Sequence, residues 1–268
     1  MIKFKTIRST VSKIFTESQQ MKIVICISDI FWFLRKYFLA VDIDYSKEFI
    51  NNWKKVKPES SLDRERNFTL YQLLNIHNNF FKNQETNIIE FGVSRGSSLI
   101  TICNFIKKNS NIFGIDSFGI YAEEIKKLST SNVDQNYQGS QIAFNKRTRF
   151  KNFNTQKLYN NILEQDNFKD KRLFLIECHF PDNLKSEDWE KISNRKYSFA
   201  YIDFDLSISI YDALEFIIPK LEKKAILLID DYNMINQEGC KAAVKKFGLD
   251  EKRCFQTSGG QLVFFNGS

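Results

Sequence analysis

The chain has 268 residues, of which 43% are hydrophobic and 26% are charged, and its formal net charge is +7. This length and apolar content allow a sizeable core, which excludes an intrinsically disordered protein and fits one α/β domain with an appendage. The basic residues are scattered and form no basic-aromatic block, so nucleic acid is not an expected partner, although a basic surface could attract a phosphorylated substrate.

Residues 1–61 are predicted to form a helical extension. Its most apolar stretch, residues 21–41, is interrupted by charged residues, so no transmembrane span is expected. Aromatic side chains on several faces favour a helix that packs on the domain or on a second subunit, and we expect a homo-oligomer. The alternative is peripheral membrane contact through Phe31, Trp32, Phe33 and Phe38 beside Arg35 and Lys36. Residues 54–61 are predicted to be a linker.

Residues 62–268 are predicted to form the main domain, which begins with an amphipathic helix over 62–82. His77 lies on the apolar face of this helix and is expected to be packed rather than a ligand. Alternating strands and helices follow, and they end in a hairpin around a Ser-Gly-Gly turn. The predicted strands are 87–91, 111–116, 172–178, 198–203, 225–229, 254–257 and 261–265; the predicted helices between them are 99–108, 122–127, 155–165, 206–224 and 239–247.

This order predicts an α/β fold with a mostly parallel, Rossmann-like sheet and a C-terminal antiparallel hairpin, plus the N-terminal helical segment. The five cysteines are odd in number, form no Cys-x-x-Cys pair and mostly lie in apolar runs. We therefore expect reduced core cysteines and, since no secretion signal is visible, a cytoplasmic protein.

Residues 198–232 hold the strongest functional signal. They form a strand–helix–strand unit in which each strand is followed by two acidic residues: Asp203 and Asp205 on the first, Asp230 and Asp231 on the second. Because parallel strands end at the same edge of a sheet, the four carboxylates should gather where open α/β sheets bind ligands. Their repulsion requires a cation, a proton or a basic partner. Oxygen donors without His or Cys favour Mg²⁺, Mn²⁺ or Ca²⁺, while the structural alternative is helix capping or pairing with Lys223 and Lys224.

A glycine-bearing turn at residues 92–98 follows the strand 87–91, and Ser97 or Ser98 is predicted to cap the next helix. Its Gly-x-x-x-Gly spacing is neither the dinucleotide fingerprint nor a P-loop, so NAD, FAD and nucleotide triphosphates fit poorly. Glycine would let a ligand approach the backbone closely, and Asp116, at the end of the next strand, is a carboxylate suited to a ribose diol. A plain tight turn is the alternative.

Several short motifs together resemble the macrocin O-methyltransferase type of class I S-adenosylmethionine (SAM) enzymes. These enzymes methylate sugar hydroxyls and depend on Mg²⁺. The resemblance covers roughly residues 62–268. The matching segments are 90–98 (EFGVSRGSS), 116–118 (DSF), 203–214 (DFDLSISIYDAL), 218–221 (IPKL), 229–232 (IDDY) and 239–247 (GCKAAVKKF).

The resemblance implies roles for individual residues. The SAM-binding positions would be Glu90, Gly92, Arg95, Gly96, Ser97, Asp116 and Ser117. The ligands for Mg²⁺ (or Mn²⁺) would be Asp205, Asp230 and Asp231. Asp203 would be the catalytic base, and His179, in a segment that resembles the family's lid, is a second catalytic candidate or a structural residue. The chain departs from the family at Ser207 and Ile208, where relatives have Tyr-Glu, and at Asn183 in the lid.

These residues imply a Mg²⁺-dependent O-methyltransferase that acts on a sugar, either a small molecule or a polysaccharide precursor. One alternative is a non-catalytic binding or assembly protein with the SAM-binding fold, which the departures at Ser207 and Ile208 and the aromatic N-terminal helix suggest. The other alternative is a nucleotide-cofactor oxidoreductase, against which the missing dinucleotide fingerprint argues.

Overall fold

The structure is a computed structural model, and it describes residues 45–57, 64–107, 109–118, 155–163, 171–233 and 238–267. The predicted helix 122–127 and the aromatic stretch of the N-terminal extension lie outside these residues. No helix in the described ranges is long and apolar enough to cross a membrane.

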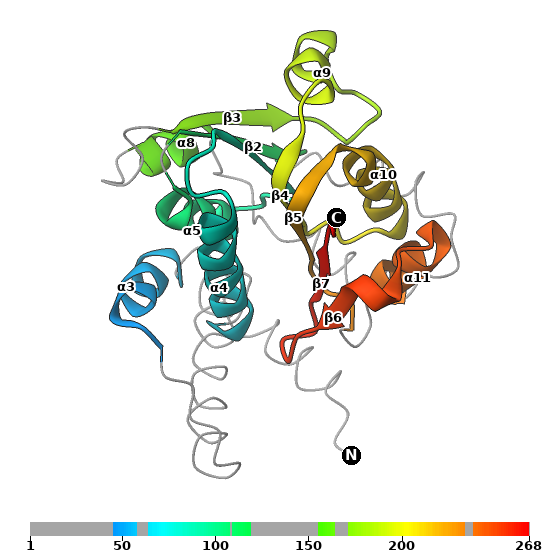
Figure 1. Cartoon of the computed structure of the whole chain (residues 1–268). Helices are drawn as coiled ribbons and strands as arrows, with labels where there is room; N and C mark the ends of the chain where they lie inside the picture. Colours follow the sequence, from blue (N-terminus) through cyan, green and yellow to red (C-terminus); the bar gives the residue numbers. More distant parts are fainter. Residues whose placement is uncertain are drawn as a thin grey trace, which may run out of the picture.

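A seven-stranded sheet with the order β3-β2-β1-β4-β5-β7-β6 forms the centre of the molecule (Figure 1). Strands β1 to β5 are mutually parallel, and β7 pairs antiparallel with both β5 and β6. The strands are β1 (Thr86–Phe91), β2 (Ser110–Asp116), β3 (Arg172–Glu177), β4 (Tyr197–Ile202), β5 (Leu221–Ile229), β6 (Cys254–Gln256) and β7 (Leu262–Phe265). The predicted class, a mostly parallel sheet closed by an antiparallel hairpin, is confirmed.

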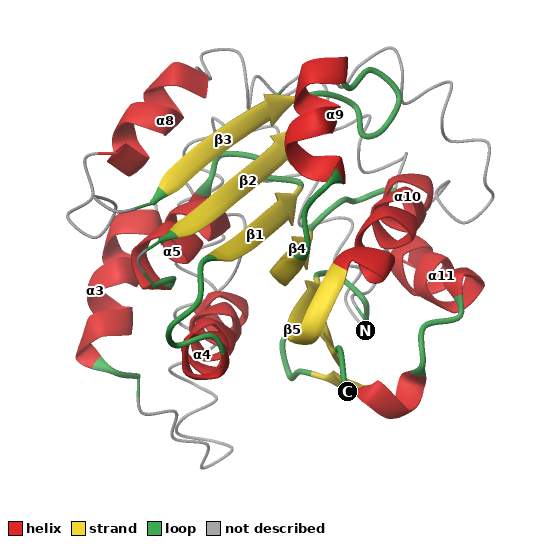
Figure 2. Ribbon diagram, turned by 45° about the horizontal axis from the view of Figure 1, so that its top comes forward, coloured by secondary structure: helices red, strands yellow, loops and turns green. Residues whose placement is uncertain are grey.

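Helices cover both faces of the sheet, which explains why its central strands are apolar on both sides (Figure 2). Neighbouring residues alternate between two cores: Ile88 packs with one and Ile89 with the other. The first core involves α3 (Lys47–Val56), α4 (Arg64–Phe80), α5 (Ser97–Phe105) and α8 (Thr155–Leu163). The second involves α9 (Ser186–Ser193), α10 (Ser207–Ile217) and α11 (Glu238–Phe247).

The helix between β4 and β5 is shorter than predicted. It ends at Ile217, a 3₁₀ turn follows over Ile218–Lys220, and β5 already begins at Leu221. Pro219 has no N–H to continue the α-helical ladder, and this explains the early end. Helix α9 was not predicted, because it is short and buries a single residue, Ile192.

The predicted linker at 54–61 is wrong at its start, because Lys54, Lys55 and Val56 belong to α3. Phe49 and Trp53 of this helix are buried in the same core as α4 and α5. The proposed division at residue 61 falls in a stretch outside the described residues and stays a prediction.

His77 is packed, as predicted. It is buried, its Nε2 lies 2.8 Å from Ser198 Oγ, and burial lowers the pKa of the imidazole to about 4. The described cysteines, Cys103, Cys178, Cys240 and Cys254, are free thiols, consistent with the predicted reduced state.

Candidate active site

The carboxylates that follow β4 and β5 converge, as the sequence predicts, but with a different membership. One oxygen each from Asp203, Asp230 and Asp231 lies within 4.8 Å of the others; these three residues are called the acidic cluster below. Asp203 directly follows β4, and Asp230 and Asp231 directly follow β5, its parallel neighbour. Asp205 does not belong to this group.

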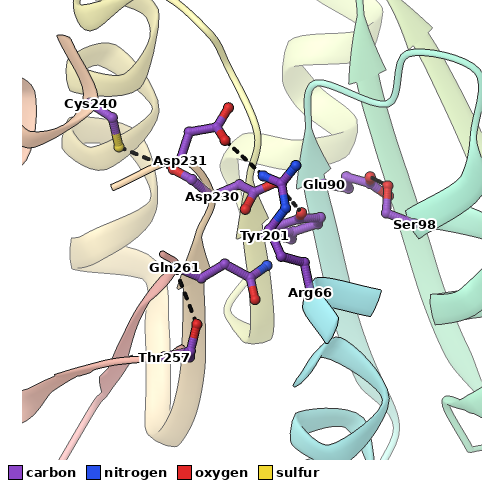
Figure 3. Close-up of polar contacts among 9 residues, drawn as sticks. All are labelled: Arg66, Glu90, Ser98, Tyr201, Asp230, Asp231, Cys240, Thr257 and Gln261. Atoms are coloured by element: carbon purple, nitrogen blue, oxygen red, sulfur yellow. Dashed lines mark hydrogen bonds and ion pairs between the residues drawn. The ribbon is translucent and has the colours of Figure 1, made fainter. Parts of the chain in front are cut away.

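The counter-charge of the acidic cluster comes from Arg66 in the first turn of α4 (Figure 3). Its Nη1 lies 2.9 Å from Asp230 Oδ2 and 2.7 Å from Asp231 Oδ1. The Tyr201 hydroxyl also donates to Asp230 Oδ2, at 3.1 Å.

Arg66 was not singled out from the sequence, which indicated only that the acids need a cation or a basic partner. The two lysines that the sequence offers as alternative partners lie at the opposite end of β5 from the acids. Lys223 and Lys224 lie near the start of β5, whereas Asp230 follows its end. The contact with Arg66 joins residues 164 positions apart, and no local spacing reveals such a contact.

A single guanidinium leaves the site short of positive charge. Burial, followed by the charges of Asp230, Asp231 and Asp205, raises the pKa of Asp203 well above its usual range, and Arg66 only partly opposes this. Asp230 Oδ1 is buried and has no hydrogen-bond partner among the described residues.

The donor set fits a hard divalent cation, since it offers carboxylate oxygens and contains no histidine. Cys240 is nearby, but its Sγ donates to the Asp230 carbonyl oxygen at 3.1 Å. Burial, reinforced by the charges of Asp231, Asp230 and Asp203, raises the pKa of this thiol well above its usual value.

Gly92, at the end of β1, joins the glycine turn to the acidic cluster. Its φ is +92°, and a Cβ there would lie 2.3 Å from the Asp203 carbonyl oxygen. The Asp203 N–H in turn donates to the Phe91 carbonyl oxygen at 2.7 Å. Glycine is therefore required for the β4 chain to pass against the end of β1, whether or not a ligand is present.

Glycine at position 96 is favoured by its backbone conformation and by the close approach of Leu158. Gly96 has a φ of +88°, it is the N-cap residue of α5, and a Cβ would lie 2.4 Å from Leu158 Cδ1. The predicted cap by Ser97 or Ser98 is wrong, since α5 has no side-chain cap. Ser98 instead donates its hydroxyl to Glu90 Oε1, because the glutamate is buried directly beside it.

Asp116 lies at the end of β2, beside β1, and its carboxylate is held by main-chain donors. Oδ2 accepts from the Ser94 N–H and Oδ1 from the Phe118 N–H, both at 2.7 Å. Each carboxylate oxygen has a second lone pair, so a pair of ribose hydroxyls could still donate to it.

Glu90 is fully buried within β1. Burial, reinforced by the charge of Asp116 and opposed by the Ser98 hydrogen bond, raises the pKa of Glu90 to about 8. At neutral pH the carboxyl group is therefore mostly protonated, and its Oε2 has no partner among the described residues. This leaves a buried polar group beside the glycine turn.

The remaining predicted SAM residues lie in the same region. Arg95 is partly buried in the turn, Ser97 is the buried first residue of α5, and Ser117 follows β2. The structure thus brings the whole predicted SAM set to the ends of β1 and β2. Phe91 pairs with Ile202 in the parallel ladder, so this set lies beside the acidic cluster at one edge of the sheet.

His179 is separate from the acidic cluster but close to the SAM set, because the N–H of the preceding Cys178 donates to the Asp116 carbonyl oxygen at 2.9 Å. His179 follows β3, and β2 and β1 lie between that strand and β4, a separation of about 14 Å at the usual strand spacing. Its N–H donates to Asn183 Oδ1 at 2.6 Å. The next residue, Phe180, packs against Phe91 and Phe216 and fixes the segment over β1 and α10.

Two solved structures with a similar fold are methyltransferases. The O-methyltransferase NovP has 17% identity and a TM-score of 0.58 over 78% of this chain and 83% of its own. The TDP-rhamnose 3'-O-methyltransferase CalS11, from calicheamicin biosynthesis, has 16% identity and a TM-score of 0.51 over 94% and 93%. At these identities the likeness establishes the class I methyltransferase fold.

The search of proteins with curated functions gave no significant match. The family model described as macrocin O-methyltransferase, in contrast, matches residues 53–254, which is more than half of the chain and includes β1 to β5 and every residue of both groups at the sheet edge. The chain belongs to the macrocin O-methyltransferase family and is an O-methyltransferase enzyme.

Proposed function

We propose that the protein transfers the methyl group of SAM to a sugar hydroxyl and that it uses Mg²⁺ (or Mn²⁺) to do so. The observation that carries this proposal is the convergence of Asp203, Asp230 and Asp231 beside the glycine turn that ends β1. A donor site and an acceptor site at one sheet edge suit an in-line transfer, because the reaction mainly requires the two reactants to be aligned.

The donor side consists of the turn after β1 and the end of β2. Asp116 is positioned by the Ser94 and Phe118 amides to accept from ribose hydroxyls. The protonated Glu90 carboxyl adds a buried polar group. Arg95, Gly96, Ser97 and Ser117 complete the proposed SAM contacts.

On the acceptor side, the geometry favours a metal-ligand set that differs from the one the resemblance implies. Asp203 was expected to be the base and Asp205 a metal ligand, but Asp203 is the residue that converges with Asp230 and Asp231. We therefore assign the metal to Asp203, Asp230 and Asp231, and assign the proton acceptor to Asp205, the remaining carboxylate of the motif. When bound, Mg²⁺ supplies a positive charge that makes a neighbouring hydroxyl easier to deprotonate.

The substrate class rests on the family and on the printed activity of CalS11, which methylates a nucleotide-linked rhamnose. We propose a sugar-containing small molecule or polysaccharide precursor as the acceptor. A cytoplasmic location and a homo-oligomer stay predictions.

The test combines binding with turnover. Calorimetry with S-adenosylhomocysteine should show binding without added metal. Transfer of labelled methyl from SAM to a panel of nucleotide sugars should require Mg²⁺ or Mn²⁺ and should stop with EDTA. If S-adenosylhomocysteine did not bind, the SAM assignment would be overturned. Full turnover in EDTA would overturn the metal assignment alone.

Family membership argues against both alternatives considered from the sequence. The non-catalytic alternative rests on the Ser207–Ile208 departure and on the aromatic N-terminal helix, which lies outside the described residues. Ile208 is exposed, in the first turn of α10. Turnover of any sugar in the panel would eliminate that alternative.

A further inference from the structure

The start of α4 is fixed against the turn between β6 and β7. A Cβ on Gly259 would lie 2.7 Å from Arg66 Cγ, so the turn packs directly against the arginine stem. Ser258 Oγ donates to Glu65 Oε1, and the Asn233 N–H donates to the Gly260 carbonyl oxygen at 2.9 Å. The C-terminal hairpin therefore holds Arg66 in place beside the acidic cluster.

The Arg66 guanidinium contacts two of the three carboxylates that the proposed function assigns to a metal ion. A single nitrogen, Nη1, bridges Asp230 Oδ2 at 2.9 Å and Asp231 Oδ1 at 2.7 Å. A divalent cation binds carboxylate oxygens at about 2.0–2.6 Å. Two cations on the same pair of carboxylates would repel strongly in this buried place, where Arg66 and Asp230 are 11% and 1% exposed.

Gln261 supplies the second observation. It is 0% exposed, and neither its Nε2 nor its Oε1 has a hydrogen-bond partner among the described residues. Leu262 pairs with Ile229, so Gln261 occupies the next register position, opposite Asp230. Figure 3 shows its amide pointing toward the Arg66 side chain.

A buried amide without partners is costly and calls for an explanation. A primary amide oxygen is a good acceptor for a guanidinium N–H. Gln261 Oε1 is thus an available acceptor beside an arginine that the metal would displace.

We propose that Arg66 is a built-in cation that holds the Asp230–Asp231 pair until a divalent metal enters, and that Gln261 accepts the displaced guanidinium through Oε1. This inference rests on the metal site of the proposed function. It assigns Arg66 and Gln261 as residues that set metal affinity without being ligands.

The test is a double-mutant cycle on Mn²⁺ affinity, measured by calorimetry with the full chain. Arg66→Met removes the competing charge, and we expect Mn²⁺ to bind at least about 10-fold more tightly. Gln261→Leu removes the acceptor for the displaced arginine, and we expect binding about 10-fold weaker, the lower end of the effect of a residue just outside a metal's ligands. In the Arg66→Met background, Gln261→Leu should leave the affinity unchanged.

Two further variants serve as controls. Arg66→Gln keeps hydrogen-bond donors but removes the charge, so it should also tighten Mn²⁺ binding, and it replaces Arg66→Met if that variant does not fold. Arg172, the exposed first residue of β3, pairs with Glu85. Arg172→Met should leave the Mn²⁺ affinity unchanged.

Each contrary result has a distinct meaning. Unchanged or weaker Mn²⁺ binding in both Arg66 variants would overturn the competition. A Gln261→Leu effect that persists without Arg66 would show that Gln261 acts on the metal site directly. Failure of every variant to bind Mn²⁺, with S-adenosylhomocysteine still bound, would refute the metal site together with this inference and leave the SAM assignment standing.

Discussion

The two groups of carboxylates at the sheet edge solve the problem of buried acid in different ways. At the ends of β1 and β2, Asp116 accepts two main-chain N–H bonds, and Glu90 is kept mostly protonated by burial. At the ends of β4 and β5, three carboxylates converge, and one guanidinium from a distant helix pairs with two of them, Asp230 and Asp231. The donor side is therefore organised by the fold itself, whereas the charge balance of the acidic cluster depends on a cation.

Gly92 is the one position where a single change should damage both sides. In Gly92→Ala, the new Cβ would meet the Asp203 carbonyl oxygen at 2.3 Å while φ stays at +92°. We expect a loss of about 3–5 kcal/mol in the free energy of unfolding, at the upper end for single substitutions. Denaturant unfolding measures this loss, and calorimetry should show weaker binding of both Mn²⁺ and S-adenosylhomocysteine.

Gly248→Ala is the matched control for that prediction. Gly248 has a φ of +77°, but nothing lies within 4 Å of its would-be Cβ. Only backbone strain of about 1–2 kcal/mol is expected. If the two variants lost the same free energy of unfolding, the contact with Asp203 would contribute nothing to the cost of Gly92→Ala.

Asp230→Asn should separate the two sides. It removes the charge of a carboxylate that Arg66 and Tyr201 both contact. We expect Mn²⁺ affinity to fall by more than about 100-fold, because loss of a residue outside the ligand set already costs 10–100-fold. The affinity for S-adenosylhomocysteine should not change. Asp188→Asn, on an exposed pair with Lys191, is the control, and an unchanged Mn²⁺ affinity in Asp230→Asn would remove Asp230 from the ligand set.

Asp116→Asn makes the opposite separation. The asparagine amide group would face one of the two N–H groups of Ser94 and Phe118 that the carboxylate now accepts. We expect about 10-fold weaker S-adenosylhomocysteine binding, in line with one lost charge-assisted hydrogen bond. Mn²⁺ binding should be retained, and a parallel loss of both affinities would contradict the independence of the two sides.

The sequence predicted most of the fold because the central strands are apolar runs that alternate with amphipathic helices. Sheet class, the C-terminal hairpin and the gathering of acids after β4 and β5 all follow from that pattern. Helix α9 leaves little pattern in the sequence because it buries only Ile192, and α10 ends before its hydrophobic spacing does because Pro219 follows.

The site was predictable to the extent that it depends on strand ends. Which of the acids converge could not be read from the motif, because Asp203 and Asp205 both follow β4 and only the path of the chain past Gly92 distinguishes them. The sequence does not reveal Arg66 and Gln261, because each approaches from a segment distant in sequence, the first turn of α4 and the residue before β7. The need for a basic partner was visible in the charge of the four acids, but its identity was not.

The last prediction uses Glu90 to test how the donor side tolerates a buried acid. In the folded protein its pKa is raised from 4.5 to about 8, so between these values the folded chain keeps a proton that the unfolded chain releases. Stability from this group is therefore fully present below about pH 4.5 and is lost as pH rises toward 8, with a slope of at most about 1.4 kcal/mol per pH unit. Glu90→Gln cannot ionise and should flatten the decline measured by denaturant unfolding between pH 5 and pH 8. Glu85 is exposed, so Glu85→Gln should keep the wild-type slope. Parallel curves for wild type and Glu90→Gln would show that Glu90 is already ionised at neutral pH. Both sides of the sheet edge would then carry buried negative charge.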